Sequence, residues 1–388
     1  MRDSFLLFSP PLIGDEEIAE VVDTLRSGWL TSGPKTARFQ QEFAAYVDAP
    51  AALAVNSCTA ALHIALLAHG VGEGDEVITT PMTFAASVNV IEHVGARPVL
   101  VDVEPDTLNI DAHRIEAALS DRTRAILPVH YAGHPVDLGA VHRVAAANSL
   151  AVVEDAAHAL CAAHEGRPIG SGGSVAAFSF YATKNLTTGE GGMLTGPPEV
   201  LERARVFSLH GMNRDAWRRY DEAGTWFYEI EAPGFKYNMT EIQASLGLHQ
   251  LAKLERFQQR RREVVQRYDE AFGGLPYLET PTTREGVTHA HHLYVLRLRP
   301  GAPVDRGTLI EELRARNIGT SVHFIPVHLH PYYREKYGWQ PEDFPVAFDS
   351  YRRMLSLPLN PTLSDRDVAD VIEAVRDVLG DRRLRDAG

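Results

Sequence analysis

A single lysine stands between an apolar run and a glycine-rich turn. The run carries Ser179 and ends at Tyr181, Lys184 follows, and the turn spans residues 189–192. The chain has only five lysines against 33 arginines. Because aromatic neighbours partly desolvate the amine, its pKa should fall, and an uncharged amine can attack a carbonyl carbon. Lys184 could therefore hold an aldehyde cofactor as a Schiff base. The alternative is a lysine at a strand end with its ammonium group in solvent.

A carboxylate at the end of another apolar run could serve the same cofactor. Asp155 follows the predicted strand 151–153. At that position a carboxylate could pair with a protonated ring nitrogen and keep the ring electron-withdrawing. Considered alone, an acid in this place is more typical of a helix cap. The residues by themselves leave both roles for Asp155 open.

An anion-binding turn is predicted between a strand at 51–55 and a helix at 60–69. Ser57, Cys58 and Thr59 occupy this turn. Backbone N–H groups at a helix start, together with two hydroxyl groups, favour a phosphate. A simple helix cap is the alternative, since strand-to-helix turns commonly use one.

The elements that must position these groups alternate along the chain. Apolar runs predict strands at residues 51–55, 76–79, 98–101, 125–129 and 151–153, with helices between them. This alternation favours βαβ units and a largely parallel sheet, in which ligands gather at the carboxyl ends of the strands. An amphipathic helix is predicted before the sheet, ending at Gly28, with one apolar face formed by Ile18, Val21, Val22 and Leu25.

A second, smaller domain is predicted after the sheet. A long helix within residues 237–268 begins near Thr240 and leads into it. Its elements are predicted as a strand at 293–298, a helix at 309–316, a strand at 319–323 and a helix at 365–379. We therefore expect a large domain over residues 1–250, including the N-terminal segment, and a small α+β domain over residues 251–388.

Composition excludes several classes of protein. The net charge of −13 disfavours binding to nucleic acid or to an anionic membrane. There is no apolar stretch long enough to span a bilayer and no basic-then-apolar leader, so we expect a soluble, cytoplasmic protein. The basic runs 260–262 and 382–383 are expected on solvated helix faces. The segment 72–75 lacks the third glycine of a dinucleotide fingerprint, which disfavours a Rossmann dehydrogenase.

Metal binding is also disfavoured. The two cysteines, Cys58 and Cys161, form no Cys-x-x-Cys pair. Histidines cluster at residues 289–292 and 323–330, but no acidic or cysteine partner shares their spacing. We expect these histidines to lie on strand faces or to contact substrate, and we expect no metal site.

The segment 178–192 resembles the lysine signature of the DegT/DnrJ/EryC1/StrS family of pyridoxal-phosphate-dependent sugar aminotransferases. The similarity covers nearly the whole chain and includes residues 81–87, 129–137, 153–158 and 233–243. It implies the α/β type I fold of aspartate aminotransferase-like enzymes. That fold has a large domain built on a mostly parallel seven-stranded sheet and a small C-terminal α+β domain. It also implies a homodimer in which each active site is completed by the neighbouring subunit.

The resemblance assigns roles to individual residues around pyridoxal 5'-phosphate. Lys184 becomes the Schiff-base lysine and proton carrier, and Asp155 the partner of the ring nitrogen. The other cofactor contacts that it implies are Ser57, Cys58, Thr59 and Ser179 at the phosphate, Phe84 on the ring, His158 near the phenolic oxygen and Asn238 from the neighbouring subunit. Cys58 stands where glycine is usual in the family, but a contact made by a backbone N–H group should survive that change.

A long irregular segment, residues 211–235, is rich in arginine and aromatic residues. Trp217 and Arg218 within it could contact the base and diphosphate of a nucleotide, or the segment could be a dimer arm. With His323, this segment resembles the branch of UDP-4-amino-4-deoxy-L-arabinose aminotransferase-like enzymes, which aminate C4 of nucleotide-linked sugars. We therefore expect amino transfer from glutamate to a nucleotide-linked 4-keto sugar.

Three alternatives to this expectation stay open. One is amination of a 3-keto sugar. Another is the sugar dehydratase branch of the family, whose members carry histidine in place of the lysine. The last is a cofactor-binding regulator without turnover.

Overall fold

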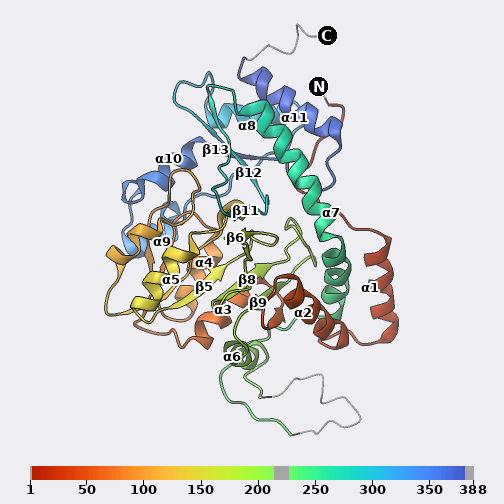
Figure 1. Cartoon of the computed structure of the whole chain (residues 1–388), viewed down its shortest axis with the longest axis vertical. Coiled ribbons are helices and arrows are strands. Elements are labelled where there is room, and N and C mark those ends of the chain that lie inside the picture. Colours follow the sequence, from red (N-terminus) through yellow and green to blue (C-terminus); the bar gives the residue numbers. More distant parts are fainter. Residues whose placement is uncertain (1, 214–226, 381–388) are drawn as a thin grey trace.

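A seven-stranded sheet is the centre of the computed structural model, which describes residues 2–213 and 227–380 (Figure 1). The strands follow the order β1-β9-β8-β5-β4-β2-β3. Their bounds are β1 Ala52–Val55, β2 Glu76–Thr79, β3 Arg97–Leu100, β4 Thr123–Ile126, β5 Ala151–Asp155, β8 Val175–Ser179 and β9 Gly192–Thr195. Only β9 runs antiparallel to its neighbours, β1 and β8, so the predicted mostly parallel sheet is confirmed.

Helices cover both faces of this sheet, so most strand residues are buried and apolar residues do not strictly alternate with polar ones. The helices of this part of the chain are α1 Asp15–Ser27, α2 Pro34–Tyr46, α3 Cys58–Ala68, α4 Ala85–His93, α5 Leu138–Ala147 and α6 Pro198–Ser208, with 3₁₀ turns at Ala112–Arg114, Glu116–Ala118 and Tyr131–Gly133. The central helix α3 is buried almost all round, with Leu62, Ile64 and Leu66 in the core against β8 and β9. Its start is therefore held firmly beside the carboxyl ends of the strands.

One helix, α7 Glu241–Phe272, connects two hydrophobic cores. It begins in a capping box between Thr240 and Gln243. Its first half places Leu248 and Leu254 in the core beneath the large sheet, and its second half places Tyr268 and Phe272 in the core of the C-terminal region. Because both cores contain residues of α7, this helix holds the large sheet and the C-terminal region together.

The C-terminal region is built on a second, antiparallel sheet. Its strands are β10 Leu278–Glu279, β12 Tyr294–Leu298 and β13 Met354–Leu357, in the order β10-β12-β13. The remaining helices are α8 Arg306–Ala315, α9 Pro331–Tyr337, α10 Pro345–Arg353 and α11 Asp365–Val378, with 3₁₀ turns at Val327–Leu329 and Pro341–Asp343. A small third sheet joins β6 Ala163–His164, β7 Arg167–Pro168 and β11 Val287–Thr288.

The predicted strand at residues 319–323 is wrong. Backbone hydrogen bonds from this segment are divided between two partners, since Gly319 pairs with Leu6 at 2.9 Å and Ser321 pairs with Ser356. Neither partner continues alongside the segment, so no ladder forms. The third strand of the antiparallel sheet is β13 instead. Residues 319–323 form no strand, and they carry His323 toward the large domain.

The N-terminal residues lie against the small domain rather than against the large sheet. Arg2 forms ion pairs with Asp367 at 2.6 Å and Asp370 at 2.8 Å on α11, and Leu6 forms a parallel bridge with Ile318. The N-terminal label beside α11 shows the same placement (Figure 1).

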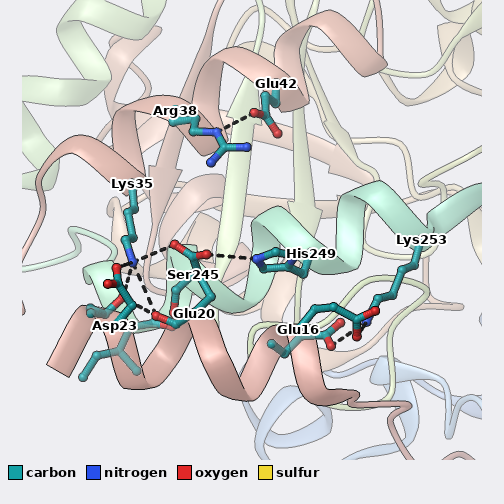
Figure 2. A network of polar contacts seen from close by, with 12 residues as sticks. Glu16, Glu20, Asp23, Lys35, Arg38, Glu42, Ser245, His249 and Lys253 are labelled. Carbon is teal, nitrogen blue, oxygen red and sulfur yellow. Dashed lines mark hydrogen bonds and ion pairs between the residues drawn. The ribbon is translucent and has the colours of Figure 1, made fainter. Parts of the chain in front are cut away.

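The first helix packs by its charged face. Figure 2 shows acidic residues of α1 pointing at basic residues of α2 and α7. Glu20 pairs with Lys35 at 2.6 Å and with His249 at 3.0 Å. The predicted helix exists and ends at Gly28, which has a left-handed φ of 75°. Its apolar face points outward, with Ile18 55% exposed and Leu25 53% exposed.

The expectation of a solvated helix face for residues 260–262 is wrong at Arg261. This side chain is 1% exposed. Its Nη1 donates to the carbonyl oxygens of Leu359 at 2.8 Å and His291 at 3.2 Å. A guanidinium group can be buried where backbone carbonyls accept its hydrogen bonds, and α7 supplies such a place where it passes between the two cores.

Among the described residues, no helix combines the length and the apolar composition that crossing a bilayer requires.

Candidate active site

A cavity of about 530 Å³ opens beside the carboxyl ends of the parallel strands. This edge is where sheets of this kind bind ligands. It gathers residues that lie far apart in the sequence. The predicted site residues that line it are Ser57, Cys58, Thr59, Phe84, Asp155, His158, Ser179, Lys184 and His323.

Lys184 lies in the turn that follows β8. Its backbone N–H group donates to Tyr181 O at 2.9 Å, which closes the turn. The fully buried rings of Phe178 and Phe180 anchor the chain that leads into it. Burial of the amine lowers the pKa of Lys184 to about 8, an effect that the nearby Asp155 carboxylate partly offsets. A sizeable fraction of the amine is therefore uncharged near neutral pH, as a nucleophile requires.

Asp155 is the last residue of β5 and is 6% exposed. Two hydrogen bonds orient its carboxylate. Ser87 Oγ donates to Asp155 Oδ2 at 2.7 Å, and the backbone N–H of Ala157 donates to Oδ1 at 3.1 Å. Asp155 does not cap a helix, because no helix begins at the end of β5.

The start of α3 forms the anion-binding wall of the cavity. Ser57 is the N-cap of α3, and its Oγ accepts a hydrogen bond from Ala60 N at 3.1 Å, so the capping alternative is realised in the same turn. Cys58 turns its thiol into the core, where Sγ–H donates to Ala177 O at 3.4 Å. Burial raises the pKa of this thiol well above its ordinary value, so it stays neutral.

A glycine lets the sheet approach this helix start closely. A side chain on Gly192 would place its Cβ 2.5 Å from the Ser57 carbonyl carbon and 2.6 Å from Cys58 N. Because a glycine lies there, the first N–H groups of α3 and the Ser179 hydroxyl share one wall of the cavity. Such a helix start favours a phosphate.

Aromatic rings form the rest of the wall. Phe84 is 65% exposed, so it is not a residue of the hydrophobic core. Its ring lies 6.0 Å from that of Phe324, and the Phe324 ring lies 5.7 Å from that of His158. A planar ligand lying against Phe84 would thus meet an apolar surface.

His323 reaches the cavity from the small domain. Its Nδ1 lies 2.8 Å from Ser356 Oγ, and its ring stacks on Phe8 at 5.3 Å. Burial, with a smaller effect of Lys184, lowers the pKa of His323 to about 4. The imidazole is therefore neutral at physiological pH.

Two predicted residues, Trp217 and Arg218, lie outside the described residues. Asn238 is described and does not line the cavity. The backbone of Asn238 forms a bridge with Val55, and its side-chain Nδ2 donates to Ser32 Oγ at 2.9 Å. Asn238 therefore lies beside the start of α3 and not in the cavity wall.

The sequence analysis missed Ser87, which carries the hydrogen bond to Asp155 but looks like any small residue of a helix. His292 belongs to the histidine cluster that was expected on strand faces or in contact with substrate, and it lines the cavity. Within residues 2–213 and 227–380, no three His, Cys, Asp or Glu side chains gather as a metal site would require.

The residues present fit a phosphorylated aldehyde cofactor. The cavity offers an amine of lowered pKa, a carboxylate, a helix start and an exposed aromatic ring. In addition, His158 Nδ1 is buried without a hydrogen-bond partner, which leaves Nε2 as the ring nitrogen available to a ligand. Together with the doubly covered sheet, this set defines a lysine-dependent enzyme of the pyridoxal-phosphate class.

The chain belongs to the DegT/DnrJ/EryC1/StrS aminotransferase family, whose sequence model matches residues 11–376. It is 55% identical over 381 residues to the spore coat polysaccharide biosynthesis protein SpsC of Bacillus subtilis, covering 97% of this chain and 98% of that protein. The recognition of the family, made above from sequence motifs, is thereby confirmed.

Solved structures agree with this assignment. The putative sugar aminotransferase Spr1654 from Streptococcus pneumoniae, in its PMP form, has a TM-score of 0.91 and 37% identity, covering 97% of this chain and 99% of that one. S. venezuelae DesV, solved in complex with a ketimine intermediate, has a TM-score of 0.86 and 38% identity, covering 93% of this chain and 94% of that one. Spr1654 is also known in a PLP form. The type I fold and the pyridoxal-phosphate dependence of the family are therefore as expected.

Proposed function

We propose that this sugar aminotransferase moves an amino group from glutamate to a nucleotide-linked 4-keto sugar. The observation that carries the aminotransferase chemistry is Lys184, an amine with a pKa of about 8 in a cavity that it shares with Asp155 and the start of α3. A base of near-neutral pKa is suited to carrying a proton back and forth.

Each wall of the cavity has a role in this proposal. When bound, pyridoxal phosphate supplies an aldehyde that accepts the amino group and a ring that withdraws electrons from the reacting carbon. Backbone N–H groups at Ser57, Cys58 and Thr59, with the Ser179 hydroxyl, hold the phosphate. Asp155 keeps a proton on the ring nitrogen.

The remaining residues orient the ring and move the proton. Phe84 would lie against the ring, and His158 would donate a hydrogen bond to the phenolic oxygen. Lys184 would hold the aldehyde carbon between reactions, and its amine, when free, would carry a proton between the amino donor and the cofactor carbon.

The sugar is proposed to enter from the side of His323. Its ketone at C4 lies across the ring from the anomeric diphosphate, so the nucleotide would extend away from Lys184. Residues Trp217 and Arg218, predicted from sequence to contact the nucleotide, supply an aromatic ring and a cation suited to a base and a diphosphate. The relationship to a polysaccharide biosynthesis protein supports a sugar substrate.

The site is proposed to be shared between two subunits of a homodimer. Asn238 does not line the cavity of its own chain, and its amide donates to Ser32 Oγ at 2.9 Å, so in this proposal the amide would turn to the phosphate of a neighbouring subunit. The outward apolar face of α1, which includes Ile18, Val22 and Leu25, supports this assembly, because such faces commonly mark contacts between subunits.

Features of the site argue against the alternatives. The dehydratase branch replaces the lysine by histidine, whereas Lys184 is present. A regulator without turnover has no need of a lysine of lowered pKa, an oriented carboxylate and a helix start in one cavity. Amination at C3 differs from amination at C4 only in how the sugar lies, so substrate comparison must decide between them.

The test has two stages. First, glutamate added to the purified holoenzyme should bleach the visible absorbance of the cofactor as the amino group is transferred. Absence of bleaching would contradict the aminotransferase proposal. Second, a panel of UDP- and dTDP-linked 4-keto and 3-keto sugars should be supplied with glutamate, and amino sugars measured by mass spectrometry. Preference for a 3-keto sugar would overturn the C4 assignment alone.

A further inference from the structure

His292 lines the cavity from the small-domain side and is not needed by the proposed chemistry. It lies two residues before the start of β12, and its side chain is 6% exposed. Its Nδ1 lies 3.0 Å from Oδ1 of Asn185, the residue that follows Lys184. The imidazole is therefore tied to the segment that carries the reactive amine.

The surrounding amides determine which nitrogen of His292 carries the proton. Asn185 Nδ2 donates to Ala290 O at 2.9 Å, and Gln258 Nε2 donates to the same oxygen at 2.9 Å. A carbonyl oxygen only accepts hydrogen bonds, so the amide of Asn185 cannot be reversed without placing two oxygens against each other. Asn185 Oδ1 must then face His292, and His292 Nδ1–H must donate to it.

His292 is also held neutral. Burial is the largest cause that lowers its pKa well below the ordinary value, and His158, Lys184, Arg261 and His323 act in the same direction. With Nδ1 protonated and the ring uncharged, Nε2 carries a lone pair. The plane of the ring is set by the hydrogen bond to Asn185.

The ring of His158 depends on such a neighbour for its orientation. Its Nδ1 is buried without a hydrogen-bond partner. Its ring instead contacts that of His292, with centroids 4.3 Å apart and planes 34° apart, and that of Phe324 at 5.7 Å. A buried ring nitrogen without a hydrogen-bond partner costs less free energy as a bare lone pair than as an N–H group. Nδ1 of His158 is therefore unprotonated, and its Nε2–H group is the donor toward the cavity.

We propose that His292 is a positioning residue that holds His158 as a hydrogen-bond donor toward the phenolic oxygen of the cofactor. This proposal rests on the proposed function, because it takes His158 as a cofactor contact. Asn185 fixes the plane of His292. His292, together with the stacked ring of Phe324, fixes the plane of His158 by ring contact. The turn after β8 that carries Lys184 is in this way linked to the donor in the loop after the neighbouring strand β5.

The proposal is tested by binding of pyridoxal phosphate to four forms of the full-length protein: wild type, His292→Leu, His158→Leu and the double variant. His292→Leu should weaken cofactor binding by about threefold to tenfold, the equivalent of one lost aromatic contact. It should also shift the visible absorbance band of the bound cofactor. In the His158→Leu background the same substitution should change neither quantity, because the residue through which it acts is gone.

His292→Phe separates ring contact from general disturbance of the fold. It retains an aromatic ring against His158, so it should recover most of the affinity and the band position lost in His292→Leu. Urea unfolding of each apo protein shows whether the variants fold. Additive effects of His292→Leu and His158→Leu, or wild-type binding by a folded His292→Leu protein, would overturn the proposal.

Ring ¹⁵N chemical shifts give a second, direct measurement. In the apo protein labelled at histidine, the His292 signals, identified by their loss in His292→Phe, should report a protonated Nδ1 and a bare Nε2. The opposite tautomer would overturn the link through Asn185. If wild-type holoenzyme is bleached by glutamate while the His292 variants behave as wild type, only this inference fails and the proposed function stands.

Discussion

Ser87 Oγ donates a hydrogen bond to Asp155 Oδ2 across 2.7 Å. Ser87 lies in the first turn of α4, which follows β2, and Asp155 ends β5, so the bond joins a helix start to a strand end at the carboxyl edge of the sheet. Since the Ser87 proton is used in this bond, the contact of 2.7 Å between Thr83 Oγ1 and Ser87 Oγ must be donated by Thr83. This chain of hydroxyl groups orients the carboxylate before any cofactor binds.

Asp155→Ala should give a folded protein that binds cofactor poorly and transaminates very slowly, because the ring nitrogen loses its counter-charge. Ser87→Ala keeps the carboxylate and removes only one hydrogen bond, so it should lower the rate by about tenfold and no more. Rapid-mixing measurements of glutamate-dependent bleaching give both rates, and circular dichroism checks the fold. Near-normal bleaching by Asp155→Ala would sink the assigned role.

Lys184→Ala should abolish turnover and the covalent attachment of the cofactor. Borohydride reduction of the holoenzyme, followed by peptide mass spectrometry, should label wild type at Lys184 and leave the variant unlabelled. Lys253→Ala is a matched control, because Lys253 pairs with Glu16 at 2.8 Å and Glu17 at 2.7 Å, away from the cavity. Cofactor trapped on another lysine in Lys184→Ala would falsify the assignment.

Lys184 should also destabilise the apo protein in a pH-dependent way. Its pKa is about 8 in the folded chain against an ordinary value of 10.5, so between these values the unfolded chain holds more of this proton. The contribution of Lys184 to the free energy of unfolding therefore rises with pH between about 8 and 10.5. Apo Lys184→Met should be more stable than apo wild type below pH 8, by at most about 3 kcal/mol.

Urea unfolding of the two apo proteins at pH 7 and at pH 9.5 checks this sign. The advantage of Lys184→Met should shrink at the higher pH, where the folded wild type no longer buries a charge. A difference that is the same at both pH values, or that grows, would show that the amine is not desolvated as described.

Mixing two inactive variants should restore activity if the site is shared. Asn238→Ala and Lys184→Ala each lack one residue of every site in a homodimer. A hybrid dimer carries one site in which both residues are intact, so mixed and refolded protein should recover part of the wild-type rate. Differently tagged subunits allow hybrids to be purified before the assay. Confirmed hybrids with no activity would count against a shared site.

Much of the fold could be predicted from sequence because local pattern and burial agree there. The five predicted strands of the large sheet are mostly buried and read as short apolar runs, and the helices between them are either amphipathic, as α5 is, or apolar all round, as α3 is. The predicted strand at 319–323 failed because its composition suits a strand but its hydrogen-bonding partners do not. The expectation that Arg261 is solvated was wrong for a similar reason. A run of basic residues does not indicate that backbone carbonyl groups from distant segments will accept hydrogen bonds from one of them.

The sequence by itself determined the chemistry of the site: one lysine after a buried aromatic strand, one acid at a strand end and one hydroxyl-rich helix start. These are local features of the sequence, and the motifs of the family consist of them. Only the tertiary structure showed that His292 packs against His158 and bonds to Asn185 in the cavity of Lys184, and that α1 turns its apolar face outward. Such relationships depend on how α7 and the two sheets pack together, and packing between distant segments leaves no periodic signal in the sequence.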